Sequence, residues 1–181
     1  VLRQSADAGA VAAIERLIRE APDGDLSRVN VLDFARTNNI DEERAIAAFL
    51  HAARLGLFEL SWNVLCPGCG GVLDSNATLK TVDQEAYACA LCAAGYEPTL
   101  DEMVEVAFTV APSVRRIAAH DPESLSIWQY MRQMFWSSGL ELPEGDAFDE
   151  LLQEMIIESV ELPAGEKAHL SLQLPAQFII V

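Results

Sequence analysis

The four cysteines of the chain are its clearest candidates for chemistry. They form two pairs, Cys66-x2-Cys69 and Cys89-x2-Cys92, with 19 residues between the pairs. Two residues between cysteines let both sulfurs of a pair point at one ion from a tight turn, and two such knuckles supply a tetrahedral site. A small residue beside the sulfurs, such as Gly68, lets backbone N–H groups approach them. The pattern predicts one zinc ribbon with Cys66, Cys69, Cys89 and Cys92 as the metal ligands.

Three other uses of the cysteines remain open: two disulfides, a thioredoxin-like redox pair, and an iron site with four thiolates. A cytoplasmic chain disfavours disulfides, and a redox pair needs only one of the two motifs. Four thiolates fill a tetrahedron and leave no position for water, and His51, His120 and His169 are all far from the knuckles in sequence. We therefore expect a structural Zn²⁺ that replaces the missing core of a small ribbon.

No other catalytic constellation stands out in the sequence. It has no phosphate-cradling glycine loop, no nucleophile elbow and no His-Glu-x-x-His motif, so we predict no catalytic residues and no further cofactor. His120 and Asp121 resemble a base with an orienting acid, but Asp121 precedes Pro122 and we interpret it as a helix cap. Arg115 and Arg116 suit an acidic partner or a phosphate; the simpler interpretation is a solvated loop or strand end.

The charge of the chain restricts its partners. It has 28 acids against 12 bases, a formal net charge of -16, and four thiolates on one Zn²⁺ would make this about -18. Nucleic acids and anionic membranes would be repelled over most of the surface, so neither is an expected partner. No apolar stretch approaches the roughly 18 to 20 residues of a membrane span, and no signal pattern opens the chain. We expect a cytoplasmic protein.

Three helices and a strand are predicted for residues 1–60. The helices cover 7–20, 27–37 and 41–55, and an alternating run at 58–64 predicts the strand. This order resembles a winged-helix head. The apolar residues expected to face inward are Val31, Leu32 and Ala35 in the second helix and Ile46, Phe49, Leu50 and Ala53 in the third.

The ribbon is placed at 61–100, and 101–181 is predicted as a β-rich region with one amphipathic helix at 122–137. Its strand is 104–110, and a short helix at 146–152 precedes a hairpin turning at 163–166 and a strand at 177–181. On the helix, Trp128, Met131 and Phe135 are expected to face the core. Tyr130 and Trp136 fall off that face, where they would make a homodimer or interdomain contact.

The chain as a whole is predicted to be an α+β protein and a piece of something longer. It begins with Val1, not Met, and it ends in the apolar run Phe178–Val181 without a polar stop.

Several of these segments together resemble an uncharacterised bacterial domain family that lies N-terminal to class III adenylate/guanylate cyclase catalytic domains. The resemblance covers about residues 40–181 and is carried by the second knuckle and by residues 56–69, 104–115, 162–167 and 170–175. It implies a cytoplasmic regulatory or scaffolding segment upstream of a cyclase, with no catalysis in this region. The metal-binding aspartates of a class III cyclase have no counterpart here, so only the four cysteines transfer with a role.

The leading functional hypothesis is a non-enzymatic module that regulates or assembles an attached signalling enzyme through protein contacts. The first alternative is a zinc-ribbon, winged-helix regulator of transcription that binds nucleic acid. It is disfavoured because the third predicted helix opens with Asp41, Glu42 and Glu43, which would face a phosphate backbone with carboxylates. The second alternative is a small-molecule sensor in the β-rich region. The signal sensed, the partner and the oligomeric state do not follow from the sequence.

Overall fold

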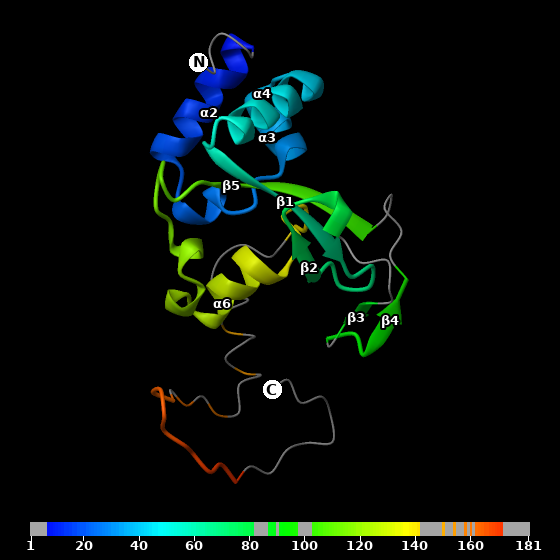
Figure 1. Cartoon of the computed structure of the whole chain (residues 1–181), viewed down its shortest axis with the longest axis vertical. Coiled ribbons are helices and arrows are strands. Elements are labelled where there is room, and N and C mark those ends of the chain that lie inside the picture. The colour runs from blue at the N-terminus through cyan, green and yellow to red at the C-terminus, as the bar shows by residue number, and fades with distance from the viewer. Residues whose placement is uncertain are drawn as a thin grey trace. The chain divides into compact units, whose positions relative to one another are not determined.

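The computed structural model describes residues 7–81, 87–89, 91–97, 103–141, 150, 154, 158, 160 and 162–171. The chain divides into two compact units, Val1–Glu141 and Leu142–Val181. The first unit holds the elements from α2 to η5 and both sheets (Figure 1), and the four cysteines lie within its residues. Among the described residues, no helix combines the length and the apolar character that crossing a membrane requires.

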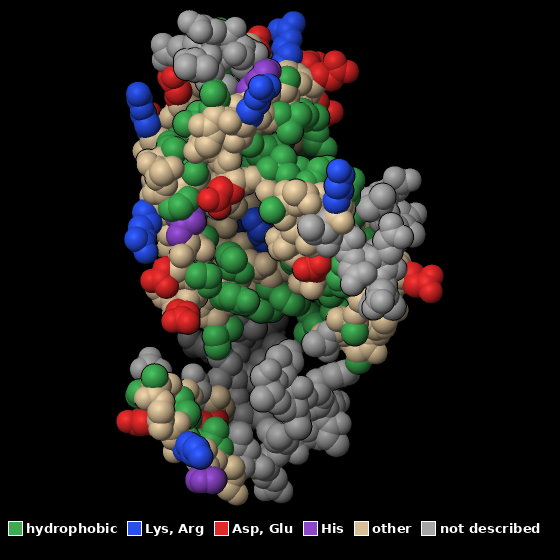
Figure 2. Space-filling view, viewed as in Figure 1, with side chains coloured by type: hydrophobic (Ala, Val, Ile, Leu, Met, Phe, Trp, Pro, Cys, Tyr) green, Lys and Arg blue, Asp and Glu red, His purple; other side chains and the backbone are tan. Residues whose placement is uncertain are grey.

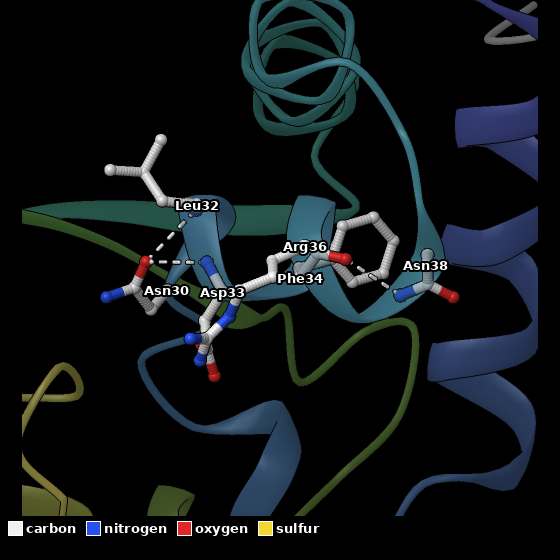
Figure 3. Close-up of polar contacts among 6 residues, drawn as sticks. All are labelled: Asn30, Leu32, Asp33, Phe34, Arg36 and Asn38. Atoms are coloured by element: carbon white, nitrogen blue, oxygen red, sulfur yellow. Dashed lines mark hydrogen bonds and ion pairs between the residues drawn. The ribbon is translucent and has the colours of Figure 1, made fainter.

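Three capped helices open the first unit: α2 (Ala8–Glu20), α3 (Val31–Asn38) and α4 (Glu42–Arg54). The Asp7 carboxylate caps α2 by accepting hydrogen bonds from two backbone N–H groups at 3.0 Å. Figure 3 shows the Asn30 amide oxygen capping α3 at the N–H groups of Leu32 and Asp33, while Asn38 donates to the Phe34 carbonyl near the other end. The helix at 7–20 and the start of the third helix are as predicted.

The second helix begins four residues later than predicted, at Val31. A short 3-10 helix, η1 (Asp23–Leu26), ends just before the expected start at residue 27; Ser27 is extended, and Arg28 has a left-handed φ of 50°. A residue in that conformation cannot continue a right-handed helix. The helix ends as expected, because Asn39 adopts the left-handed conformation with φ 52°.

The predicted inward faces of α3 and α4 are partly wrong. Leu32, Ile46 and Leu50 are 52%, 40% and 48% exposed. The buried face of α4 consists of three alanines and one phenylalanine: Ala45, Ala48, Phe49 and Ala52. Small side chains allow the neighbouring helices to approach closely, so the tightest contact forms on the alanine face and the larger aliphatic side chains remain outside.

A three-stranded antiparallel sheet follows, with strand order β2-β1-β5. It contains β1 (Phe58–Leu65), β2 (Val72–Asn76) and β5 (Val104–Val110), and its long β1–β5 ladder runs from the pair Phe58↔Val110 to Val64↔Val104. The chain just before α3 adds a single bridge to the free edge of β5, Val29↔Phe108. Both predicted strands in this region, 58–64 and 104–110, are confirmed.

The core of the first unit lies between the three helices and this sheet. The Phe49 ring sits at its centre, with ring-centroid distances of 5.0 Å to Phe34, 5.1 Å to Phe58 and 5.2 Å to Phe108. Such edge and tilted contacts between aromatic rings add to the stabilisation from burial alone. The helices are thereby fixed to one end of the β1–β5 ladder, and the ribbon departs from the opposite end, after Leu65 and before Val104.

The helix predicted at 122–137 is shorter. Two short 3-10 turns, η3 (Ala118–His120) and η4 (Pro122–Ser124), precede it, and the Asp121 side chain makes no capping hydrogen bond. The cap is Ser126, which begins α6 (Ile127–Tyr130), and a wide π turn, η5 (Met131–Phe135), completes the helix. Trp128, Met131 and Phe135 are half-buried.

Trp136 corrects a second expectation for this helix. It was predicted to lie off the packed face in an outer contact, but it is only 9% exposed. The reason is that the helix ends at Phe135, so Trp136 is extended and no longer follows helical periodicity.

In the second unit, the turn predicted at 163–166 is present. The Glu166 N–H donates to the Pro163 carbonyl at 3.0 Å, and Gly165 has φ 88°. The described residues on either side of the turn, within 162–171, form no strand. Of the predicted short helix at 146–152 only Glu150 is described, and it is helical; the predicted strand at 177–181 lies outside the described residues.

Candidate metal centre

Two hairpins bring the four cysteines together. Cys66 and Cys69 lie in the loop between β1 and β2. Cys89 ends β3 (Tyr87–Cys89), five residues before β4 (Ala94–Tyr96) begins, and Cys92 lies in the turn between them. The first loop is a tight knuckle, because the Cys66 N–H donates to the Gly71 carbonyl at 2.7 Å and the Gly70 N–H to the Cys66 carbonyl at 2.8 Å. In the second, the Cys92 N–H donates to the Cys89 sulfur at 3.4 Å.

The sulfur positions fit one tetrahedral ion. All four Sγ atoms lie within 4.8 Å of one another, with 3.8 Å between Cys66 and Cys92 and 3.7 Å between Cys69 and Cys89. Zinc–sulfur bonds near 2.3 Å give a tetrahedron with sulfur–sulfur edges of about 3.8 Å. A disulfide needs sulfurs about 2 Å apart, so these cysteines are free thiols. The predicted residues Cys66, Cys69, Cys89 and Cys92 therefore form a cluster that can hold a metal ion.

The surroundings of the cysteine cluster stabilise one thiolate, at Cys66, and oppose the ionisation of Cys69 and Cys92. Burial acts to raise the pKa of Cys66, but hydrogen bonds from the backbone at Cys69 and Gly68 and from neighbouring side chains lower it to about 6. Burial and the adjacent thiols raise the pKa of Cys69 to about 12. Four thiolates can therefore coexist only if a cation compensates their charge, which is what a bound metal ion would supply.

Gly68 and Tyr96 form the wall of the cluster. A Cβ atom on Gly68 would lie 2.9 Å from the Tyr96 hydroxyl oxygen and 3.1 Å from the Cys92 sulfur. The hydrogen bond between the Tyr96 hydroxyl and Cys66 raises the pKa of the Tyr96 phenol to about 12, so the hydroxyl keeps its proton. Tyr96 is a site residue that sequence reasoning missed; its place in the strand after the second knuckle was the available signal.

The first knuckle is fixed to the end of the helix α6–η5. The Ser137 N–H donates to the Gly70 carbonyl at 2.8 Å, and Gly71 forms a β-bridge with Trp136. A Cβ atom on Gly71 would lie 2.8 Å from the Phe135 ring and 3.3 Å from the Cys69 sulfur. The metal centre and the helix are therefore in direct contact through two glycines.

A buried arginine joins the same helix to the head, and no pattern in the sequence indicated this contact. Arg28 is 8% exposed; its Nε donates to the Gln133 carbonyl at 2.8 Å and its Nη2 to the Trp136 carbonyl. Burial lowers the pKa of the guanidinium, and the charge of Glu105 acts to raise it. Its Nη1 has no partner among the described residues.

Glu105 anchors the chain just past Trp136. One carboxylate oxygen accepts a hydrogen bond from Asn63, and the other accepts from the Ser137 hydroxyl and from the N–H and hydroxyl of Ser138. Asn63, fully buried in β1, accepts in turn from Ser75. This network holds the helix end, β5 and the hairpin β1–β2 in one arrangement.

The other candidates from the sequence serve the fold. Arg115 donates to the Ile18 carbonyl and to Asp23, both at 2.8 Å, so the interpretation of a solvated loop is wrong for this residue, whereas Arg116 is exposed. The His120 ring accepts from the Ile117 N–H at 3.1 Å and lies 2.9 Å from the Val110 carbonyl. Since Nδ1 is the acceptor, Nε2 carries the proton and donates.

The described residues define a mixed helix-and-sheet protein with antiparallel sheets and a four-cysteine centre able to hold a metal ion. The chain belongs to a family of unknown function, DUF5939, whose model matches residues 1–181. No curated protein matches the sequence significantly, and no solved structure does.

Proposed function

We propose that this chain is a non-catalytic regulatory or scaffolding module of a signalling protein, with a structural Zn²⁺ in its ribbon. The observation that carries the proposal is the closed set of four sulfurs, all within 4.8 Å of one another. A tetrahedral ion bound by four thiolates has no open position for water or substrate. Such an ion stabilises the ribbon and leaves function to the surrounding surfaces.

Metal analysis of the untagged protein tests the zinc assignment. Four soft thiolates in a tetrahedron suit zinc or iron, and only iron would colour the protein. We expect one equivalent of zinc in a colourless preparation. Less than about half an equivalent, a stoichiometric amount of iron, or a density map with sulfur–sulfur bonds would contradict the assignment.

The attached enzyme is the second part of the proposal. It is supported by the resemblance of residues 56–69, 104–115 and the second knuckle to the segment that precedes class III cyclase catalytic domains. The gene sequence beyond the codon for Val181 tests this part: a cyclase domain there supports it, and a stop codon contradicts it.

A winged-helix arrangement of the head is also part of the proposal. Its support is the order of elements: three helices, a bridge from Val29 to β5, and the antiparallel pair β1–β5, with the ribbon inserted between the two strands. In this arrangement α4 would correspond to the recognition helix and the ribbon to the wing.

This arrangement is the specific observation that favours the second candidate function, nucleic-acid binding. Against it stand Asp41, Glu42 and Glu43, which form the cap and first turn of α4 and are exposed. Fluorescence anisotropy with labelled DNA and RNA decides between the two. Salt-sensitive binding below roughly micromolar at physiological salt would favour the regulator of transcription; its absence favours a protein-contact module.

A further inference from the structure

The outward face of α4 has an unusual pattern of side chains. Glu43, Ala47, Leu50 and Arg54 are all exposed, and their spacing of four, three and four residues places them in one stripe along the helix. The stripe begins with the acidic Glu43, has the apolar Ala47 and Leu50 in its middle, and ends with the basic Arg54. Among the described residues, neither Glu43 nor Arg54 takes part in an ion pair.

Further apolar surface lies around this stripe. Ile46 is 40% exposed one turn before Leu50, and Leu32 on the adjoining helix α3 is 52% exposed. Figure 2 shows hydrophobic side chains gathered on the visible face in the region where Figure 1 places α3 and α4. Exposed aliphatic side chains on two packed helices are typical of a contact surface.

The stripe is self-complementary under a two-fold rotation that reverses the direction of the helix. Glu43 and Arg54 are eleven residues apart, about 16 Å along the helix axis. If two copies of α4 pack antiparallel about a two-fold axis between Ala47 and Leu50, each Glu43 faces Arg54 of the other copy. Each Leu50 then packs over the other Ala47, a large side chain against a small one.

We propose that the α4 stripe is a homodimer contact, in which a second copy of this chain packs antiparallel on Glu43, Ala47, Leu50 and Arg54. The charges of the head permit it: residues 1–60 hold 10 of the 28 acids and 7 of the 12 bases, so the head carries only -3 of the net charge of -16. Neither a basic nor an acidic partner would satisfy both ends of the stripe at once.

The size of the contact sets the strength of the dimer. Stable interfaces bury about 800 Å² on each partner, more than one 13-residue helix presents. The dimer is therefore weak and reversible, and it forms in the micromolar range or above. This inference does not depend on the zinc assignment, because α4 contributes no metal ligand.

Charge reversal tests the dimer on the full 181-residue, zinc-loaded chain. Because the contact is symmetric, Glu43→Arg and Arg54→Glu each create two like-charged pairs. We expect sedimentation equilibrium to give a dimer dissociation constant at least about 10-fold higher for each single variant. The double variant, which restores opposite charges, should return to within about 3-fold of the wild type.

Two matched controls isolate the stripe. Glu42→Arg makes the same charge change one residue earlier, about 100° away around the helix, and Arg19→Glu removes the corresponding last-turn base of α2. Both should leave the dissociation constant unchanged. Circular dichroism checks that every variant folds. A wild-type chain that stays monomeric up to millimolar concentration, single variants that dimerise normally, or a double variant that is not restored would each overturn the proposal.

Discussion

At the residue scale, the metal centre depends on the absence of a side chain at Gly68 as much as on the presence of the sulfurs. A Cβ atom there would lie 2.9 Å from the Tyr96 hydroxyl oxygen, closer than Cβ atoms in folded proteins come, and 3.1 Å from the Cys92 sulfur, tighter than most such contacts. The Tyr96 hydroxyl is hydrogen-bonded to the Cys66 sulfur, so a shift of the Tyr96 side chain away from an added Cβ atom would break that contact.

Gly68→Ala is therefore expected to weaken zinc binding by about 10- to 100-fold, the usual cost of disturbing groups around a metal site. Competition with a chromophoric chelator measures the affinity. Gly95→Ala is the matched control in the other hairpin, because its added Cβ would meet only the Tyr87 carbonyl at an ordinary 3.8 Å. Equal affinities for the two variants would contradict the role of Gly68.

The pH dependence of zinc binding follows from the thiol pKa values. Cys66, with a pKa of about 6, is ionised at neutral pH, whereas Cys69, with a pKa of about 12, is protonated. A hydrogen bond with Cys69 acts to lower the pKa of Cys92, but burial and the other two thiols raise it on balance. At least two protons must leave when zinc binds at pH 7.

Zinc affinity is thus expected to rise with pH by at least about 100-fold per unit between pH 6 and 8, and to fall by the same factor as the medium is acidified. Calorimetry in buffers of different ionisation enthalpy counts the released protons directly. Release of fewer than one proton per zinc would mean that the cluster is already largely ionised without metal.

At the element scale, the helix α6–η5 is held between the ribbon and the head. Its end contacts the knuckle glycines on one side, and on the other Arg28 binds the carbonyls of Gln133 and Trp136. These carbonyls belong to the last turn and the residue after it, where helices leave acceptors unsatisfied. A buried guanidinium at that end also faces the negative pole of the helix dipole.

Replacing Arg28 with methionine, which keeps most of the volume, removes the guanidinium hydrogen bonds to the Gln133 and Trp136 carbonyls, although the Gln133 carbonyl still accepts from the Ser27 hydroxyl at 3.3 Å. We expect Arg28→Met to lower the free energy of unfolding by about 2 to 4 kcal/mol, measured by urea unfolding. Arg36→Met is the matched control. Arg36 is 77% exposed and pairs only with Asp33 on the surface, so its replacement should cost less than about 0.5 kcal/mol. A similarly small loss of stability for Arg28→Met would show that the contact of Arg28 with the helix end is not needed to stabilise the fold.

The elements themselves were only partly predictable from sequence. The caps at Asp7 and Asp41 and the alternation at 58–64 and 104–110 are local signals, and the helices and strands that depend on them are present. The orientation of α4 is not a local property. The apolar spacing along the helix placed Ile46 and Leu50 inside, whereas the three-dimensional packing buries Ala45, Ala48 and Ala52. Nothing near Arg28 in the sequence indicates that its partners lie about a hundred residues away.

At the scale of the whole molecule, the cysteine cluster was the most predictable feature, because its ligand types and spacing fix the geometry wherever the hairpins lie. The relation between ribbon and head was not. The hydrophobic core that surrounds Phe49 draws its buried members from residues 10–58 and 108–119, and none of the described knuckle residues is among them. The ribbon interrupts this core in sequence, but the part of the ribbon that the structure describes adds no buried residue to it.

The head should therefore survive the loss of the ribbon. Without its metal the ribbon keeps few buried groups of its own, whereas the β1–β5 ladder and the Phe49 cluster do not involve the sulfurs. Cys89→Ser is expected to abolish hydrogen-exchange protection at 87–97 while protection in α4 falls by less than about 10-fold. Leu91→Ser, at an exposed position in the same knuckle, is the control and should keep both regions protected. If α4 and the ribbon instead lose protection equally in Cys89→Ser, the two form one cooperative unit, and the route that joins them is the helix end between Gly71 and Arg28.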